Sequence, residues 1–182
     1  MKTIADHVLD ILQNSVRSGA TRIEFVVEEE KNKNLFTLKI EDNGCGMSSE
    51  DLEQAANPFF TSRKTRKVGL GLPLLKQKAT GAGGSFRIDS EPEKGTVVQA
   101  VFKLNHLDRP PLGNIWETWY LTLAGNPGIR LIYRHIADGK LFVIDSEEVL
   151  EMLDGVSLRH KEVRKGIEEL IKNNLLEIEA KK

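Results

Sequence analysis

The sequence of 182 residues lacks several features that mark particular classes of protein. It has one cysteine, Cys45, so no internal disulfide can form, and this favours a reducing compartment. No apolar run approaches the roughly 20 residues that span a bilayer, and the charged N-terminal segment lacks the apolar core of a signal peptide. The net charge of -1 gives no overall field that would attract nucleic acid or a membrane. We therefore expect a cytoplasmic protein with neither nucleic acid nor a membrane among its partners.

The rest of the composition, with 40% hydrophobic and 29% charged residues, is ordinary for a globular protein. Apolar residues at helical spacing predict a first helix over residues 3–18, and alternation predicts an antiparallel hairpin over residues 21–41. A short helix capped by the S-S-E-D sequence should end near residue 56, and another helix should begin near Gly71. Two further strands, around residues 86–88 and 97–104, complete an α+β layer sandwich.

The proline-rich segment at residues 108–111 is the best candidate for a domain boundary. We expect a first domain over residues 1–106 and a small α/β domain of unassigned function over residues 107–182. This second part should contain a helix at residues 115–124, a hairpin around the A-D-G-K sequence, and two final helices.

Two features of the second part carry specific expectations. Trp116 and Trp119 fall on one stripe of their helix, which favours a place in the core over a role as an exposed interaction face. Ser146 and Ser157 are expected to cap the two final helices.

Asp10, Asn14 and Arg17 fall on one face of the first helix, because residues three and four apart are neighbours there. The amide oxygen of Asn14 can ligate Mg²⁺, which takes few protein ligands alongside substrate phosphates. The carboxylate of Asp10, one turn earlier, could orient or deprotonate a nucleophile near a γ-phosphate. Arg17 could reach a phosphate or complement the C-terminus of the helix. Seen alone, the same pattern is also that of a solvated polar helix face.

Asp42 ends the second strand of the predicted hairpin and is followed by Gly44 and Gly46. A buried carboxylate needs hydrogen-bond donors, and the exocyclic amine of adenine is a good one. The two glycines would let the backbone approach a flat base, and Thr96 at the start of the last strand could support the carboxylate directly or through water. An ordinary turn between a strand and a helix is the competing interpretation.

Gly69 and Gly71 precede the helix that contains Pro73. Free N–H groups at a helix N-terminus bind anions, and missing side chains let phosphates come close. The basic stretch at residues 61–67 supplies hydroxyls and positive charge just upstream. It could also be a solvated face or a nucleic-acid patch, but a nearly neutral chain without interleaved aromatics disfavours nucleic acid.

These motifs, taken together and in this order, resemble the GHKL superfamily of ATP-binding domains, which includes histidine kinases and DNA gyrase. The matching residues are Asp10 and Asn14 in the N box, and Asp42, Gly44, Gly46, Gly69, Gly71, Gly95 and Thr96 in three successive glycine boxes. The stretch N-P-F-F-T-S-R-K followed by V-G-L-G-L is similar to the lid of histidine-kinase catalytic domains. The resemblance covers about residues 3–104.

The resemblance implies the Bergerat fold, a mixed sheet of about four or five strands covered on one face by three helices. It implies ATP and Mg²⁺ as cofactors, Asp42 on adenine N6, Asn14 on the metal, and a lid over residues 57–68 that closes on the γ-phosphate. Asp10 is the expected catalytic residue. The expected cofactor-binding residues are Asn14, Arg17, Asp42, Gly44, Gly46, Met47, Phe60, Thr61, Ser62, Lys64, Gly69, Leu70, Gly71, Leu72 and Thr96.

Two departures from a complete histidine kinase shape the functional expectation. The domain begins directly at the N box, so we expect no helix pair carrying a phospho-accepting histidine, and His7 lies too close to the pocket to serve. Asp10 stands where many histidine kinases have asparagine and where hydrolytic or serine-kinase relatives have glutamate.

Three functions remain open after these comparisons of residues. The first is a slow ATPase that acts as a conformational switch on a protein partner, possible as a homodimer. The second is a protein kinase acting in trans, either histidine-kinase-like or similar to anti-sigma-factor serine kinases. The third is a nucleotide-sensing adaptor without meaningful turnover. The acid at position 10 favours the first two.

Overall fold

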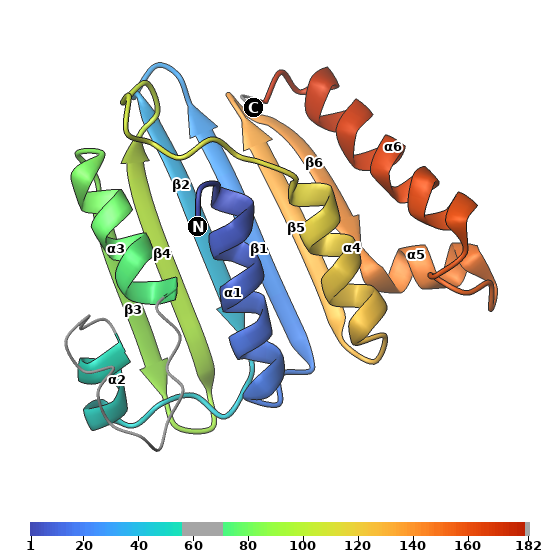
Figure 1. The fold of residues 1–182 in the computed structure, drawn as a ribbon, viewed down its shortest axis with the longest axis horizontal. Coiled ribbons are helices and arrows are strands. Elements are labelled where there is room, and N and C mark those ends of the chain that lie inside the picture. Colours follow the sequence, from blue (N-terminus) through green and yellow to red (C-terminus); the bar gives the residue numbers. More distant parts are fainter. Residues whose placement is uncertain (56–70, 181–182) are drawn as a thin grey trace.

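The computed structural model describes residues 1–55 and 71–180, which form helices packed on one open sheet (Figure 1). The helices are α1 (Ile4–Arg17), α2 (Ser49–Ala55), α3 (Gly71–Gly81), α4 (Ile115–Gly125), α5 (Ser146–Leu153) and α6 (Lys161–Glu177). The strands are β1 (Arg22–Glu30), β2 (Leu35–Asp42), β3 (Ser85–Glu91), β4 (Gly95–Lys103), β5 (Arg130–Ala137) and β6 (Lys140–Asp145).

The six strands lie in the order β3-β4-β2-β1-β5-β6. Every neighbouring pair is antiparallel except β1 and β5, which run parallel, so the sheet is mixed. Helices α1, α3 and α4 lie side by side over one face of this sheet, and α6 packs against α4 (Figure 1). This is the α+β architecture expected from the sequence.

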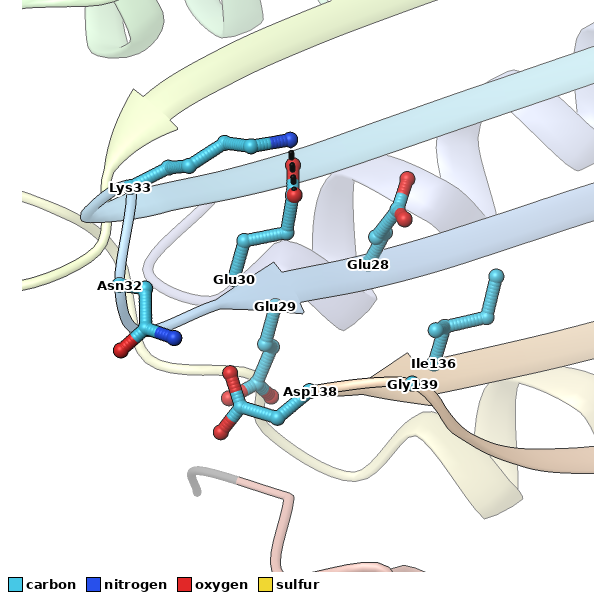
Figure 2. A pocket seen from close by; sticks show the side chains of 8 residues that line it. All are labelled: Glu28, Glu29, Glu30, Asn32, Lys33, Ile136, Asp138 and Gly139. Atoms are coloured by element: carbon cyan, nitrogen blue, oxygen red, sulfur yellow. Dashed lines mark ion pairs between the residues drawn. The ribbon is translucent and has the colours of Figure 1, made fainter.

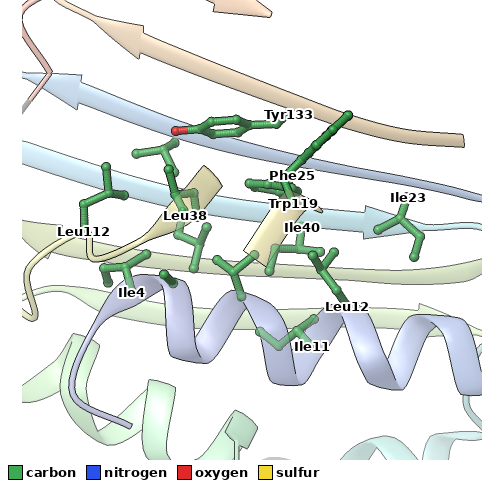
Figure 3. Packing of buried hydrophobic residues seen from close by; sticks show 14 of the residues in the cluster. Ile4, Ile11, Leu12, Ile23, Phe25, Leu38, Ile40, Leu112, Trp119 and Tyr133 are labelled. Carbon is green, nitrogen blue, oxygen red and sulfur yellow. The ribbon is translucent and has the colours of Figure 1, made fainter. Parts of the chain in front are cut away.

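Helix α1 begins at a capping box, which satisfies N–H groups that have no partner within the helix. The side chain of Thr3 accepts a hydrogen bond from the N–H of Asp6, and the carboxylate of Asp6 accepts one from the N–H of Thr3. The apolar residues of the helix are buried, and Figure 3 shows Ile4 and Leu12 on the side that faces the sheet. The helix predicted over residues 3–18 is confirmed.

The β1–β2 hairpin is also confirmed, with Phe25 opposite Ile40 and Val27 opposite Leu38. These side chains are buried because alternate residues of each strand point to the helix-covered face. Across the other side of β1, the ring of Phe25 stacks on that of Tyr133 in β5, with centroids 4.6 Å apart (Figure 3).

The segment after the proline-rich boundary contributes to the same sheet and the same core. Strand β5 pairs with β1 along its whole length, and Trp119 of α4 is fully buried among residues of the first segment. The expectation that both tryptophans belong to the core is confirmed, since Trp116 is 7% exposed and Trp119 is 0% exposed. The division at residues 106 and 107 stays a prediction about independent folding, because the two parts share one sheet here.

The two predicted serine caps are displaced. The cap of α5 is Asp145, whose carboxylate accepts a hydrogen bond from the N–H of Glu147. The hydroxyl of Ser146 accepts a hydrogen bond from the N–H of Leu131 on β5 and donates to a backbone carbonyl beside it. Helix α6 begins after His160, three residues beyond Ser157. In both cases a contact with a distant part of the chain or a local turn decides where the helix begins.

Candidate functional site

The motifs predicted from the sequence meet at one end of the sheet, where β2 ends, β4 begins and α1 passes beside α3. Asp42 lies opposite Thr96 in the β2–β4 register, and Thr96 lies opposite Ser90 in the β3–β4 register. Asp42, Thr96 and Ser90 therefore form a row across three neighbouring strands. Helix α1 brings Asp10 and Asn14 to the same region.

Asp42 is held by a hydrogen bond on each carboxylate oxygen. Its Oδ2 accepts from the hydroxyl of Ser15 on α1 at 2.5 Å, and its Oδ1 accepts from the N–H of Gly44 at 2.9 Å. Ser15 is 2% exposed, whereas Asp42 is only partly buried. A carboxylate offers about four lone-pair positions, so both oxygens can still accept from a donor on the open side.

Ser15 is not among the site residues predicted from the sequence. Its position could have been read as a signal, because it falls one turn after Ile11 on the buried, apolar stripe of α1. A hydroxyl on such a stripe needs a polar partner, and Asp42 is that partner.

Gly46 and Gly95 allow two backbone segments to lie against each other at the edge of the site. Both have left-handed backbone conformations, with φ of 64° at Gly46 and 97° at Gly95. A Cβ atom at Gly46 would lie 1.9 Å from the carbonyl oxygen of Glu91, and one at Gly95 would lie 1.9 Å from that of Asp42. These glycines therefore let the loop after β2 pack closely against the β3–β4 turn. This structural role differs from the one predicted from the sequence, in which the glycines after Asp42 let the backbone approach adenine.

Thr96 and Met47 are connected by a second serine that the sequence analysis missed. The hydroxyl oxygen of Ser90 accepts a hydrogen bond from the N–H of Met47 at 2.9 Å and lies 2.9 Å from Oγ1 of Thr96. It also lies 2.9 Å from the carbonyl oxygen of Gly95, to which it donates. Ser90 thus ties the loop after β2 to the first residues of β4.

Asp10 lies directly against the first residue of α3. A Cβ atom at Gly71 would lie 1.8 Å from Oδ2 of Asp10 and 2.7 Å from its Cγ, so only glycine permits this approach. The side-chain amide of Asn14 donates a long hydrogen bond of 3.5 Å to the same oxygen. This leaves the amide oxygen of Asn14 free of that contact.

Burial raises the pKa of Asp10 above its ordinary value, while the charge of Arg17 and the hydrogen bond from Asn14 act in the opposite direction. Arg17 itself is exposed at the end of α1. His7 is fully buried, and burial lowers its pKa. A buried histidine that favours the neutral form has a structural place in the helix layer.

The remaining predicted residues divide into two groups. Leu72 is buried in the first turn of α3, and Met47 is partly buried beside the core. The other predicted binding residues lie outside the described part of the chain: Phe60, Thr61, Ser62, Lys64, Gly69 and Leu70. The predicted lid over residues 57–68 lies outside it as well.

A separate hollow of about 370 Å³ lies at the opposite end of β1, next to the β1–β2 and β5–β6 turns (Figure 2). Its acidic side chains are accompanied by lysines, since Lys33 pairs with Glu30 and Lys31 pairs with Asp138. Among residues 1–55 and 71–180, no group of three or more acidic, histidine or cysteine side chains is arranged to hold a metal ion. None of the residues that line this hollow is a motif residue.

Comparisons with known proteins show the family to which the chain belongs. Residues 2–106 match the family described as "Histidine kinase-, DNA gyrase B-, and HSP90-like ATPase", and the chain belongs to this family. A cell-division control histidine kinase, PdhS, from Brucella ovis is 34% identical over 115 residues, which cover 56% of this chain and 11% of that protein. A putative sensor protein from Shewanella frigidimarina is 32% identical over 103 residues, which cover 56% of this chain and 16% of that protein.

The chain thus matches only a small part of these curated relatives. Among solved structures, the N-terminal domain of a DNA repair protein aligns with a TM-score of 0.53 at 16% identity, covering 79% of this chain and 52% of that one. At this identity the likeness concerns the fold alone. No helix in residues 1–55 or 71–180 combines the length and the apolar character that crossing a membrane requires.

Proposed function

We propose that this site binds ATP with Mg²⁺ and that the protein is a slow ATPase whose nucleotide state changes its contacts with a protein partner. The observation that carries the proposal is the contact between Asp10 and Gly71. It places a carboxylate with a raised pKa at the start of an 11-residue helix, where free N–H groups favour a phosphate. A carboxylate that can act as a general base is thereby adjacent to a site that can bind a phosphate.

Asp42 is the proposed adenine-reading residue. The hydrogen bonds from Ser15 and Gly44 approach it from the protein side, so an exocyclic amine can donate to it from the open side. Thr96, one strand further along the row, supports the same end of the pocket.

Asn14 is the proposed magnesium ligand, because its amide oxygen is not used in the contact with Asp10. The described residues offer no cage of acidic side chains, which fits a metal that completes its coordination with phosphates and water. When bound, Mg²⁺ would neutralise charge on the triphosphate. Arg17 stands two turns after Asp10 and adds positive charge on the same helix.

Asp10 is the proposed general base. A carboxylate beside the γ-phosphate position can accept the proton of an attacking water as the bond from oxygen to phosphorus forms and ADP leaves. The raised pKa of Asp10 brings its basicity closer to neutral pH, which favours proton transfer.

Hydrogen bonds between the N-terminal end of α1 and the C-terminal segment support the proposed switch. The N–H groups of Ile4 and Ala5 donate to the carbonyls of Pro111 and Leu112 at 2.8 and 2.9 Å. The hydroxyl of Thr118 on α4 donates to the carbonyl of Ala5 at 3.2 Å. A movement of α1 on nucleotide binding would therefore reach the C-terminal segment, which is the proposed partner-binding part.

A protein kinase acting in trans is the second candidate function. It is favoured by the similarity to the cell-division control histidine kinase PdhS, which covers 56% of this chain. In that reaction a side chain of a partner protein would replace water as the nucleophile at the same phosphorus.

The test incubates the purified protein with γ-labelled ATP and Mg²⁺, alone and with cell extract. Release of free phosphate that is lost in Asp10→Asn supports the ATPase, and label on a second protein supports the kinase. Intact nucleotide without either product supports a nucleotide-sensing adaptor. Retention of ATP affinity in Asp42→Asn would show that the adenine site has been assigned to the wrong residue.

A further inference from the structure

We infer that Ser15 is a positioning residue that sets the selectivity of the site for a 6-aminopurine by fixing the orientation of the Asp42 carboxylate. This inference rests on the proposed function, in which Asp42 reads the exocyclic amine. It concerns a residue that the nucleotide motifs do not include and that is too deeply buried to be a simple pocket wall, at 2% exposed.

The geometry gives Ser15 a specific task. A carboxylate can rotate about the bond between Cβ and Cγ, and one hydrogen bond from the N–H of Gly44 to Oδ1 leaves that rotation loosely restrained. The 2.5 Å hydrogen bond from Ser15 to Oδ2 fixes the second oxygen. The plane of the carboxylate is then determined by two donors from two elements, α1 and the loop after β2.

Ser15 can hold this position because its own helix is anchored. The carbonyl of Ser15 accepts a hydrogen bond from the hydroxyl of Ser18 at 2.8 Å and another from the N–H of Ala20 at 3.1 Å. The end of α1 is thus tied to the turn that leads into β1. A rigid donor aimed at an acceptor is the arrangement that gives directional recognition at low reorganisation cost.

The expected consequence is a selective one. A carboxylate held in one plane accepts well from an amine and disfavours a purine that presents no donor at the same place. Loss of Ser15 should therefore weaken binding of a nucleotide with a 6-amino group and should leave a nucleotide without that group almost unaffected. A serine with only a packing role would affect both nucleotides alike.

The test measures dissociation constants for ATP and for purine riboside 5′-triphosphate, which lacks the 6-amino group, using the full chain with Mg²⁺. In Ser15→Ala, ATP affinity should fall about tenfold, as expected for a hydrogen bond to a charged group, while affinity for the other nucleotide stays within about twofold. Ser15→Cys, which fills the same space with a weak donor, should behave like Ser15→Ala, and Ser15→Thr should restore the preference for ATP.

Thr122→Val is the matched control, because it removes a buried hydroxyl that is bonded within its own helix, α4, and has no part in holding Ser15 or Asp42. Its preference for ATP should match that of the unmodified protein. Equal losses for both nucleotides in Ser15→Ala and Ser15→Cys, or no loss in either, would overturn the inference.

The same experiment separates this inference from the proposed function. If Asp42→Asn leaves ATP affinity unchanged, the assignment of the adenine site fails, and the inference fails with it. If Asp42→Asn abolishes the preference for ATP while the Ser15 variants keep it, only the role of Ser15 is wrong. Comparison of circular dichroism spectra before titration identifies any variant that has not folded.

Discussion

The two carboxylates of the site differ in how firmly the fold holds them. Asp42 accepts two hydrogen bonds, at 2.5 and 2.9 Å, from two different elements. Asp10 accepts one long hydrogen bond of 3.5 Å and lies against a glycine that leaves it unobstructed. A carboxylate with one hydrogen bond on each oxygen is suited to recognition, because its orientation is fixed while both oxygens can still accept from a ligand. A half-buried carboxylate with a raised pKa and few bonds is suited to proton transfer.

Asp10→Asn gives the strongest test of this comparison. The amide cannot accept a proton, so we expect the rate of ATP hydrolysis to fall about 1000-fold, while ATP affinity changes by less than about threefold. Release of labelled phosphate gives the rate, and titration calorimetry gives the affinity. An equal loss of affinity and rate would mean that Asp10 contributes to binding and that the two carboxylates are not divided by role.

Gly71→Ala changes the same carboxylate by steric means. The new Cβ would occupy the position 1.8 Å from Oδ2 of Asp10, so the Asp10 side chain must move away from its place beside α3. We expect the hydrolysis rate to fall about 100-fold, because a misplaced catalytic group loses much of its effect.

Gly81→Ala is the control for that variant. Gly81 ends the same helix, and a Cβ there meets no atom of the described residues within 4 Å. This substitution should leave the hydrolysis rate within about twofold of that of the unmodified protein, since it adds no clash. A similar fall of the hydrolysis rate in both variants would mean that changes anywhere in α3 impair hydrolysis, and the contact between Gly71 and Asp10 would not be the cause.

The dependence of hydrolysis on pH should distinguish the two carboxylates further. Burial raises the pKa of Asp10, so its carboxylate takes up a proton at a higher pH than an ordinary aspartate would. As pH falls through that raised value, the base is lost, and the rate should drop about tenfold for each pH unit below it. Rates measured from pH 7 downward at saturating ATP should show this acid limb, and the limb should be absent from the residual activity of Asp10→Asn.

The sequence determines much of this site but not the contacts that hold it. The spacing of Asp10 and Asn14 on α1 follows from helical geometry, and the alternation of β2 correctly leads to Asp42 at its end. The partner of a buried hydroxyl depends on which elements meet in space. Ser15 and Ser90 could therefore not be assigned from local pattern, although each contacts a motif residue or its neighbour.

The same limit applies to the fold. Alternation in β1 and the hairpin signal after β5 identify two strands, but neither says that these strands pair in parallel across more than 100 residues of chain. That pairing joins strands from both sides of the proline-rich segment in one sheet. The boundary was predicted from local composition, whereas the arrangement of the sheet depends on long-range pairing.

Thr118→Val should have the smallest effect of these changes, and it extends the comparison to the N-terminal end of α1. Valine keeps the shape of the buried side chain and removes the hydrogen bond to the carbonyl of Ala5. We expect the free energy of unfolding to fall by about 1 kcal/mol, as for a typical buried hydrogen bond, with ATP affinity within about twofold. Urea denaturation gives the first quantity and nucleotide titration the second. Thr122→Val, which removes a hydroxyl bonded within α4 itself, serves as the comparison for loss of a hydroxyl alone. Thr118→Val could instead weaken ATP binding about tenfold while the free energy of unfolding stays unchanged. In that case the N-terminal end of α1 and its contact with α4 would contribute to nucleotide binding along with Asp42.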